Sequence, residues 1–254
     1  MRRLTLATGA LLMSLMPHTA NADEETRNQP WNDLLSRYLI VGDDGVNRFD
    51  YGGLQANTAD AAALSAYLES FADLDMDTLD RDAQFAAYAN AYNALTIQHI
   101  VDRYPVKSIR SGYIVGPWKR VKMTIDGREL SLDAIEHDVL REDWDEPRVH
   151  YAVNCASYGC PNLQPVAWQA ETLDQDLTAA ARAFINHPRG VTVRERGGLQ
   201  VSTIYKWFRK DFGGDEDGVI DHLLTYANPV LAEAIRANAD IKKHDYNWSL
   251  NDVQ

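Results

Sequence analysis

Apolar and polar positions recur along this chain in patterns that predict mostly helices. Apolar residues repeat at helical spacing over residues 59–71 and again over residues 173–185, which predicts two amphipathic helices. Residues 81–102 are apolar nearly all round the helix, which indicates a helix buried on every side. Pro105 ends this helix, because a proline drives the preceding residue out of the helical conformation.

Shorter segments have the pattern of strands and turns. Residues 121–130 predict a hairpin with a type I′ turn at Asp126-Gly127, a sequence that favours the positive φ angles of that turn. Residues 191–201 predict a second hairpin around two glycines. Residues 148–154 are mostly apolar, so they predict a strand that is covered on both faces.

Further helices complete the expected fold. Ser131 is a suitable N-cap for a helix over residues 132–141, and helices over residues 205–208, 218–226 and 229–237 close the chain. Helices outnumber strands, and the strands come as hairpins rather than as βαβ units. We therefore predict an α+β fold: a mostly helical single domain with short antiparallel hairpins and a buried central strand.

The N-terminus has the three parts of a cleavable signal peptide. A basic start leads into an apolar stretch over residues 4–16, and Ala20-Asn21-Ala22 then fits the small-residue rule for cleavage. The stretch is shorter than the roughly 20 apolar residues that a spanning helix needs. Residues 1–22 are therefore predicted to be removed after Ala22, which makes the mature protein periplasmic or secreted.

The segment that follows the signal peptide is expected to be an extension of the main domain. Residues 23–56 form this N-terminal extension, with one helix over residues 31–39. Residues 23–30 are polar and are expected to be mobile. The main domain then covers residues 57–254.

The charge and the apolar content of the chain exclude two classes of interaction. The chain has a formal net charge of -12 at pH 7, which repels the phosphate backbone of nucleic acids. No segment after the signal peptide is apolar enough to span a bilayer. We expect no nucleic-acid partner and no membrane span, and an unknown small molecule or peptide as the ligand.

Two cysteines, Cys155 and Cys160, lie in a tight turn after the predicted buried strand. Export allows a disulfide between them, and Gly159 and Pro161 let the chain fold back far enough for the sulfurs to meet. The other interpretation makes Cys155 a nucleophile that is exposed where the strand ends. A nucleophilic cysteine needs a base and a lowered pKa. Both interpretations stay open on the sequence.

Several polar residues are candidates to act with Cys155. His137 is the proposed general base, with His150 as its rival, and Glu136 or Asn93 would orient the histidine. His150 and Ser157 are candidate binding residues, and Asn93 pairs on its helix face with Asn90, three residues away. The spacing of the thiols and histidines matches no common zinc pattern, so neither a metal nor another cofactor is expected.

The motifs around these residues resemble the domain-of-unknown-function 547 family. The blocks that carry the resemblance are AYNALT at 91–96, YPVKSI at 104–109, ELSLD at 129–133, IEH at 135–137, PRVHYA at 147–152, CAS at 155–157, GCP at 159–161, STIYKWF at 202–208, DF at 211–212 and YNWSLN at 246–251. The resemblance implies a family domain over residues 57–254, but no established activity. Its motif polar residues correspond to Asn93, Glu136, His137, His150, Cys155, Ser157 and Cys160. Some relatives are fused to a glutaredoxin-like domain, which hints at thiol chemistry by association.

Two functions follow as hypotheses. The first is an exported enzyme with a Cys/His-centred site, in which Cys155 serves thiol-dependent hydrolysis or acyl transfer, with thiol redox chemistry as a variant. The second is a binding or interaction module without catalysis, clipped by a Cys155–Cys160 disulfide.

Overall fold

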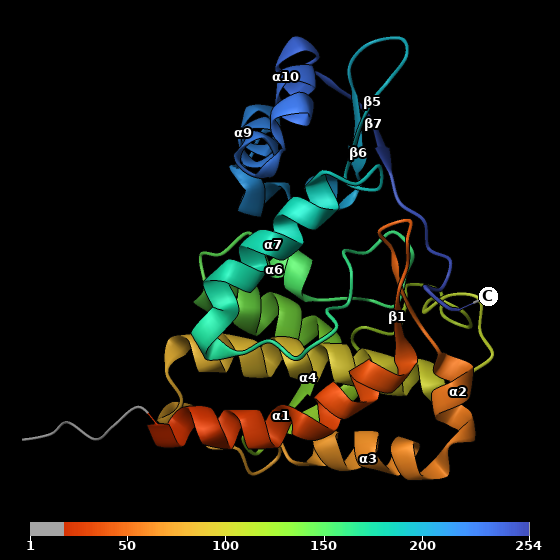
Figure 1. The fold of residues 1–254 in the computed structure, drawn as a ribbon, viewed down its shortest axis with the longest axis vertical. Helices are drawn as coiled ribbons and strands as arrows, with labels where there is room; N and C mark the ends of the chain where they lie inside the picture. The colour runs from red at the N-terminus through yellow and green to blue at the C-terminus, as the bar shows by residue number, and fades with distance from the viewer. Residues whose placement is uncertain (1–17, 254) are drawn as a thin grey trace, which may run out of the picture.

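The computed structural model describes residues 18–253, and its helices pack in successive layers (Figure 1). Helices α1 (His18–Tyr38) and α3 (Thr58–Glu69) lie side by side at one end, and α4 (Arg81–Val101) crosses above them. Helix α7 (Leu173–Ile185) covers the next layer, and a small sheet with two further helices forms the far end. The predicted α+β, mostly helical fold is confirmed.

Helix α1 corrects the expectation for residues 23–30, which were predicted to be mobile. These residues are helical, and Glu24 and Asn28 are buried despite their polarity. Asn28 Oδ1 accepts a hydrogen bond from Tyr67 Oη at 3.0 Å, and Trp31 stacks on the Tyr67 ring. A polar stretch was expected to lie in solvent, but here Asn28 has a partner on α3 and Glu24 accepts from the Ala170 N–H at 3.3 Å.

The N-terminal segment and the C-terminal tail meet in the same core. Strands β1 (Leu39–Val41) and β2 (Asn47–Phe49) form a short hairpin, and α2 (Tyr51–Ala56) follows. Asn251 accepts from the Phe49 backbone N–H at 2.9 Å and from the Tyr51 hydroxyl at 2.6 Å. Most of the stretch of residues 1–22 that predicts export lies outside the described residues, so export stays a prediction.

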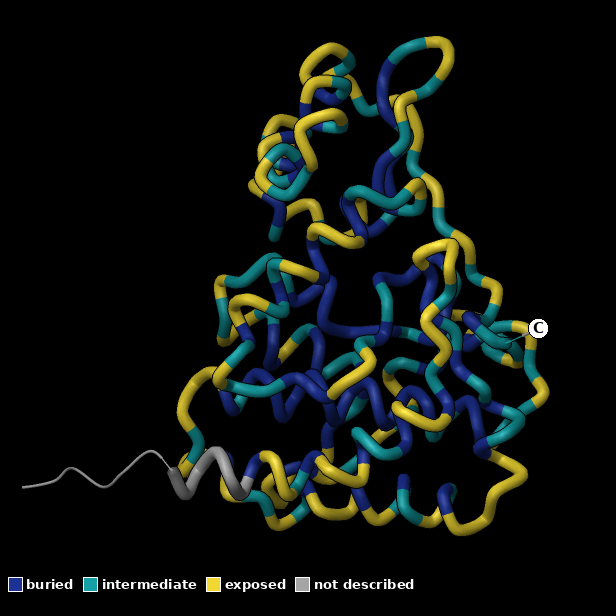
Figure 2. The backbone as a smooth tube through the Cα atoms, viewed as in Figure 1, coloured by how far each residue is buried: buried dark blue, intermediate teal, exposed yellow. Residues whose placement is uncertain are grey.

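Helix α4 is the central element, as its all-round apolar pattern predicts. Nearly all of its residues are buried, which gives the dark interior of Figure 2. A 3₁₀ turn, η1 (Met76–Thr78), precedes it, and the Asp80 side chain caps its first turn by accepting from the Ala83 N–H. The helix ends before Pro105, as predicted.

The first predicted hairpin and its following helix are confirmed. Strands β3 (Lys122–Ile125) and β4 (Arg128–Ser131) pair antiparallel, and both turn residues, Asp126 and Gly127, have positive φ as a type I′ turn requires. Ser131 Oγ caps the next helix by accepting from the Ala134 N–H at 3.0 Å. That helix contains a π-helical segment, η2 (Ala134–Leu140), and ends in α5 (Arg141–Asp143).

The buried central strand predicted over residues 148–154 is wrong. Val149–Ala152 form one helical turn, α6, and the chain becomes extended only at Val153. The burial was predicted correctly, because His150, Tyr151 and Ala152 are all inaccessible to solvent. A short apolar run does not distinguish a strand from a buried helical turn, and this run took the helical form.

The remaining elements surround the second predicted hairpin. The 3₁₀ turn η3 (Ala170–Thr172) leads into α7, and strands β5 (Val191–Val193) and β6 (Leu199–Ser202) form the hairpin itself. After these come α8 (Ile204–Trp207), η4 (Arg209–Phe212), α9 (Glu216–Tyr226) and α10 (Pro229–Ala237). Strand β7 (Ile241–Asp245) was not predicted, and it joins the sheet parallel to β6. None of the helices within residues 18–253 is long and apolar enough to cross a membrane.

Candidate functional site

A cavity of about 220 Å³ opens beside Cys155. Six aromatic side chains line it, together with both cysteines and three ionisable residues that the sequence singled out, Glu136, His137 and His150. The aromatic residues are Tyr92, Trp118, Trp207, Phe208, Tyr246 and Trp248. The structure therefore brings together five of the predicted site residues around a space that could hold a small molecule or a peptide side chain.

The two sulfurs lie in contact at the edge of this cavity. Cys155 Sγ is 2.8 Å from Cys160 Sγ, and both cysteines are free thiols. Tyr246 Oη lies 3.2 Å from the Cys155 sulfur and 3.0 Å from the Cys160 sulfur. Cys155 is partly exposed, whereas Cys160 is buried. Cys155 is therefore the more accessible residue of the two.

Hydrogen bonds set different acidities for the two thiols. Burial alone would raise the pKa of Cys160, but donors from the Cys155 thiol, Tyr246 and the Cys155 backbone N–H hold that pKa below its usual value. The neighbouring Cys160 sulfur, followed by burial, raises the pKa of Cys155. In this arrangement Cys160 is the favoured thiolate, and the Cys155 thiol donates to it.

Hydrogen bonds hold the turn that contains the cysteines on both sides. Asn154 caps it from within, because its side chain accepts from the Ala156 N–H at 2.8 Å and donates to the Pro161 carbonyl at 2.7 Å. Ala156 has a φ of 59°, a left-handed conformation that is uncommon for residues other than glycine. The C-terminal tail pairs with the turn, and a Cβ at Gly159 would lie 2.8 Å from the Asn247 nitrogen, so only glycine permits this approach.

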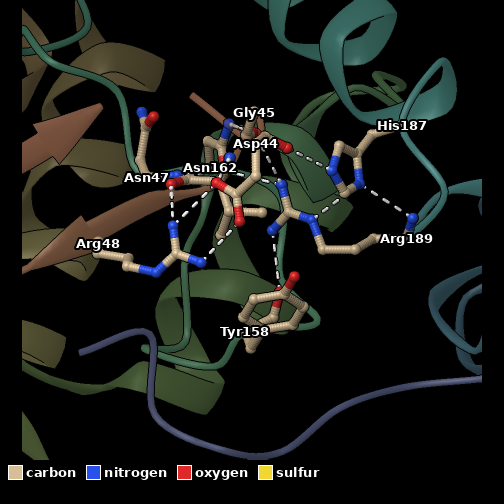
Figure 3. Close-up of polar contacts among 9 residues, drawn as sticks. Asp44, Gly45, Asn47, Arg48, Tyr158, Asn162, His187 and Arg189 are labelled. Atoms are coloured by element: carbon tan, nitrogen blue, oxygen red, sulfur yellow. Dashed lines mark hydrogen bonds and ion pairs between the residues drawn. The ribbon is translucent and has the colours of Figure 1, made fainter. Parts of the chain in front are cut away.

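Arg189 fastens the far side of the same turn (Figure 3). Its guanidinium donates to the carbonyls of Tyr158 and Cys160 at 2.9 and 2.7 Å, and to Asn162 Oδ1 at 2.9 Å. Burial lowers the pKa of Arg189, and no carboxylate pairs with it among residues 18–253. By contrast, nearby Arg48 forms a two-bonded ion pair with Asp44 at 2.9 and 2.7 Å. Backbone and amide oxygens thus position the positive charge of Arg189 next to Cys160.

Two predicted site residues contact the main chain rather than a histidine. Asn93 donates to the Ala152 carbonyl at 2.9 Å and accepts from the Asn154 N–H at 2.8 Å. These bonds hold the extended segment that leads into Cys155. Ser157 is buried, and its hydroxyl donates to the Cys155 carbonyl at 3.4 Å and lies 3.7 Å from Cys155 Sγ. Asn90, which was paired with Asn93 on the sequence, makes the same two bonds to Trp168.

Glu136 presents a carboxyl group to the cavity from a buried position. Its Oε2 accepts from the Tyr92 hydroxyl at 3.1 Å. Burial raises its pKa, and the neighbouring His137 and the Tyr92 hydrogen bond offset only part of that effect. A carboxyl group with a raised pKa holds its proton to a higher pH than an exposed glutamate does, which suits a proton donor.

The two candidate histidines are linked through one ion pair. Asp211 accepts from Arg141 at 2.6 and 2.9 Å, and from His150 Nε2 at 2.7 Å. Arg141 also lies 2.6 Å from His137 Nδ1, so this nitrogen is the acceptor of that bond. Burial would raise the pKa of Asp211, but His150 and Arg141 hold it well below its usual range.

Burial lowers the pKa of His150, whereas it raises that of a carboxyl group such as Asp211. The Asp211 carboxylate does not fully offset this effect, so His150 is a neutral donor in the folded protein. Its ring stacks on Phe208 with centroids 4.1 Å apart. His150 therefore has a partner for its Nε2 and a packed ring, as a buried histidine requires.

Sequence reasoning about single residues did not identify Tyr246, Asp211 or Arg189. Tyr246 and Asp211 lie in or beside motifs of the family resemblance, so that signal was present without an assigned role. Within residues 18–253, no cluster of three or more His, Cys, Asp or Glu side chains is arranged to hold a metal ion.

Comparison with known families supports the cysteine turn as part of a defined domain. Residues 76–185 match the family described as "Protein of unknown function, DUF547". The DUF547 match confirms the resemblance and covers α4, the first hairpin, the cysteine turn and α7. It ends before Asp211 and Tyr246, whose motifs remain predicted DUF547 blocks. Neither the curated proteins nor the solved structures contain a match to this chain.

Proposed function

We propose that this protein works outside the cytoplasm as a thiol–disulfide exchange enzyme whose Cys155–Cys160 pair cycles between dithiol and disulfide. The observation that carries the proposal is the 2.8 Å contact between the two sulfurs at the edge of an aromatic cavity. Among residues 18–253, the only side chains within hydrogen-bonding distance of either sulfur are the other cysteine, Tyr246 and Ser157. A thiol paired with a thiol suits exchange better than hydrolysis, which needs an adjacent base.

The substrate class is a disulfide-bonded small molecule or peptide. Cys155 attacks one substrate sulfur while its thiol proton passes to the Cys160 thiolate, and the leaving sulfur departs as a thiolate. Cys160 then gives its proton to that thiolate and attacks Cys155 Sγ, which releases the second substrate sulfur. Two electrons pass to the substrate, whose disulfide becomes one thiol and one thiolate that takes its proton from water, and the enzyme becomes a disulfide. The reverse sequence oxidises a dithiol.

Other residues around the cavity have supporting roles in this proposal. Tyr246 stabilises the thiolate, because its hydroxyl is within hydrogen-bonding distance of both sulfurs. Glu136, with its raised pKa, can protonate a leaving thiolate. The aromatic walls bind the apolar part of the substrate and exclude water from the sulfurs.

A matched pair of variants tests the proposal. After incubation with a model disulfide such as oxidised glutathione, Cys160→Ser is expected to accumulate a mixed disulfide at Cys155, detected by mass spectrometry. Cys155→Ser is expected to form at least about tenfold less adduct, because its remaining sulfur is buried. The wild type should release the thiol product and become oxidised. A wild-type pair that neither exchanges nor is reduced by glutathione would instead be a structural clip in a non-catalytic binding module.

Thiol-dependent hydrolysis or acyl transfer is the second candidate. It is favoured by the presence of Cys155, Glu136 and His137 on one cavity, with Cys155 as nucleophile and His137 as base. Asn93 is bonded to the main chain, which leaves Glu136 as the orienting candidate. Arg141 occupies His137 Nδ1, so only Nε2 is left to act on a substrate. The same variants separate the two candidates. A hydrolase keeps its turnover of activated esters in Cys160→Ser and loses it in His137→Gln.

A further inference from the structure

A basic segment lies in the loop between α4 and β3. Residues 103–125 contain six lysines and arginines and no aspartate or glutamate, although the whole chain has 25 basic and 37 acidic residues. The six are Arg103, Lys107, Arg110, Lys119, Arg120 and Lys122. All except Arg103 are exposed. An acidic protein therefore carries one exposed segment in which positive charge is concentrated.

Most of this positive charge is available to a partner. Lys119 pairs with Asp133, and Lys122 pairs with Glu129 at 2.7 Å. Arg103, Lys107, Arg110 and Arg120 have no carboxylate partner among residues 18–253. The charge is thus not neutralised within the described part of the chain.

The tip of the same loop is apolar. Ile114 is 97% exposed and Val115 is 84% exposed, and the two are consecutive. Single exposed apolar side chains are ordinary on protein surfaces, but two adjacent branched residues at the most exposed point of a basic loop form a distinct feature. We call Ile114 and Val115 the apolar tip.

The loop below the apolar tip is packed. Arg103 donates to the Ser111 carbonyl at 2.8 Å, and its guanidinium lies 4.6 Å from the centre of the Tyr113 ring. Gly116 has a φ of 94° and lies so close to Trp118 that any Cβ would overlap that ring. These contacts hold the base of the loop, while the apolar tip and the basic side chains stay in solvent.

We infer that this loop docks on the surface of an anionic lipid bilayer. Apolar side chains that enter the boundary between headgroups and acyl chains bind through burial, and lysines and arginines beside them attract anionic headgroups. The apolar tip and its basic flanks supply both parts. A nucleic acid would use the positive charge but offers no apolar layer for the tip.

The position of the loop connects this surface to the cavity. Trp118, at the base of the loop, lines the cavity, and its ring lies 5.8 Å from Trp248. Docking of the tip would therefore bring the cavity close to the bilayer. The inference goes beyond the proposed thiol exchange and does not depend on it, because it rests on the charge and exposure of the loop.

Vesicle sedimentation tests the inference. We expect the full chain to bind vesicles of phosphatidylcholine mixed with phosphatidylglycerol at low salt, to release from them at high salt, and to bind pure phosphatidylcholine far less. The double substitution Ile114→Asp and Val115→Asp should weaken binding to the mixed vesicles at least about tenfold. Lys107→Gln combined with Arg120→Gln should weaken it and reduce its dependence on salt.

A matched variant controls for charge and for the N-terminus. Val230→Asp changes another exposed valine, 80% accessible on α10, and should bind as the wild type does. All variants share residues 1–22, so differences between them report on the loop alone. Equal binding of the apolar-tip variant and the wild type overturns the inference. Failure of the wild type to prefer anionic vesicles also overturns it, and would leave the loop as a surface for an acidic protein.

Discussion

Tyr246 has the most direct influence on the two thiols, although it lies 91 residues from Cys155 and 86 from Cys160 in the chain. Its hydroxyl helps to hold the pKa of Cys160 down, against the effect of burial. Tyr246→Phe should therefore raise the pH at which the first thiol ionises, measured by the ultraviolet absorbance of the thiolate. Tyr205→Phe is the control, because that buried hydroxyl lies near Tyr151 and not near the sulfurs. An unchanged titration in Tyr246→Phe would remove the tyrosine from the proposed site.

Arg189 and Arg48 offer a matched comparison at the back of the cysteine turn (Figure 3). Arg189→Met removes the donors to three buried or half-buried oxygens, so we expect a loss of about 2–4 kcal/mol in the free energy of unfolding. Arg48→Met removes a surface ion pair and should cost about 0–1 kcal/mol. Urea denaturation of both variants measures the difference. Equal losses would mean that Arg189 does not hold the turn.

The sequence predicted those site residues whose own side chain carries the chemistry. Cys155, Cys160, Glu136, His137 and His150 were named from residue type and context, and all five line one cavity. Asp211 and Arg189 act through their partners, which lie tens of residues away in the chain. Nothing in a single sequence identifies such partners, because they depend on how the elements pack.

Whole elements were likewise predicted where local sequence determines them and missed where long-range packing does. Helices α4 and α7 and the hairpin β3–β4 were predicted well, since periodicity and turn chemistry are local properties of the chain. Strand β7 was missed because it pairs in parallel with β6 across three intervening α-helices, α8, α9 and α10. The segment of residues 148–154 was misassigned because burial on all sides hides the period that would separate a helical turn from a strand.

Helix α9 carries a histidine that should make stability depend on pH. His222 lies 2.8 Å from the Tyr151 hydroxyl, and burial lowers its pKa to about 4. An unfolded histidine takes up its proton near pH 6.5. Between about pH 6.5 and 4 the unfolded state therefore binds a proton that the folded state does not, and the free energy of unfolding should fall as the pH falls.

Two substitutions test this dependence. His222→Gln should give a shallower fall in the free energy of unfolding over that range, measured by urea titration at several pH values. His99 also has its pKa lowered to about 4 by burial, so His99→Gln should remove a further part of the slope. Variant and wild-type curves that stay parallel would show that these histidines titrate equally in both states.

At the scale of the whole molecule, the two ends of the chain complete the domain. The first helix packs on α3, and the C-terminal tail holds the cysteine turn and contacts β2. The segment of residues 23–56 thus shares a core with the rest of the protein, through Trp31, Phe49 and Tyr51. Truncation of the C-terminal tail would therefore disturb the surroundings of Cys155.

Export is the prediction with the widest consequence, because the compartment sets the state of the thiols. Cleavage after Ala22 would keep Glu24, Asn28 and Trp31, so the buried part of α1 described by the structure stays in the mature chain. When the chain is produced in a bacterium with a periplasm, mass spectrometry of the periplasmic fraction should find an N-terminus at Asp23.

Substitutions at the cleavage junction separate processing from folding. Ala22→Tyr should block cleavage and accumulate the precursor, whereas Asn21→Tyr, at the tolerant position between the two small residues, should be processed normally. An uncleaved wild-type chain in the cytoplasm would refute export. It would also move the Cys155–Cys160 pair into a reducing compartment, where a structural disulfide does not persist and the free dithiol becomes the working form. The outcome therefore decides in which direction the proposed exchange runs.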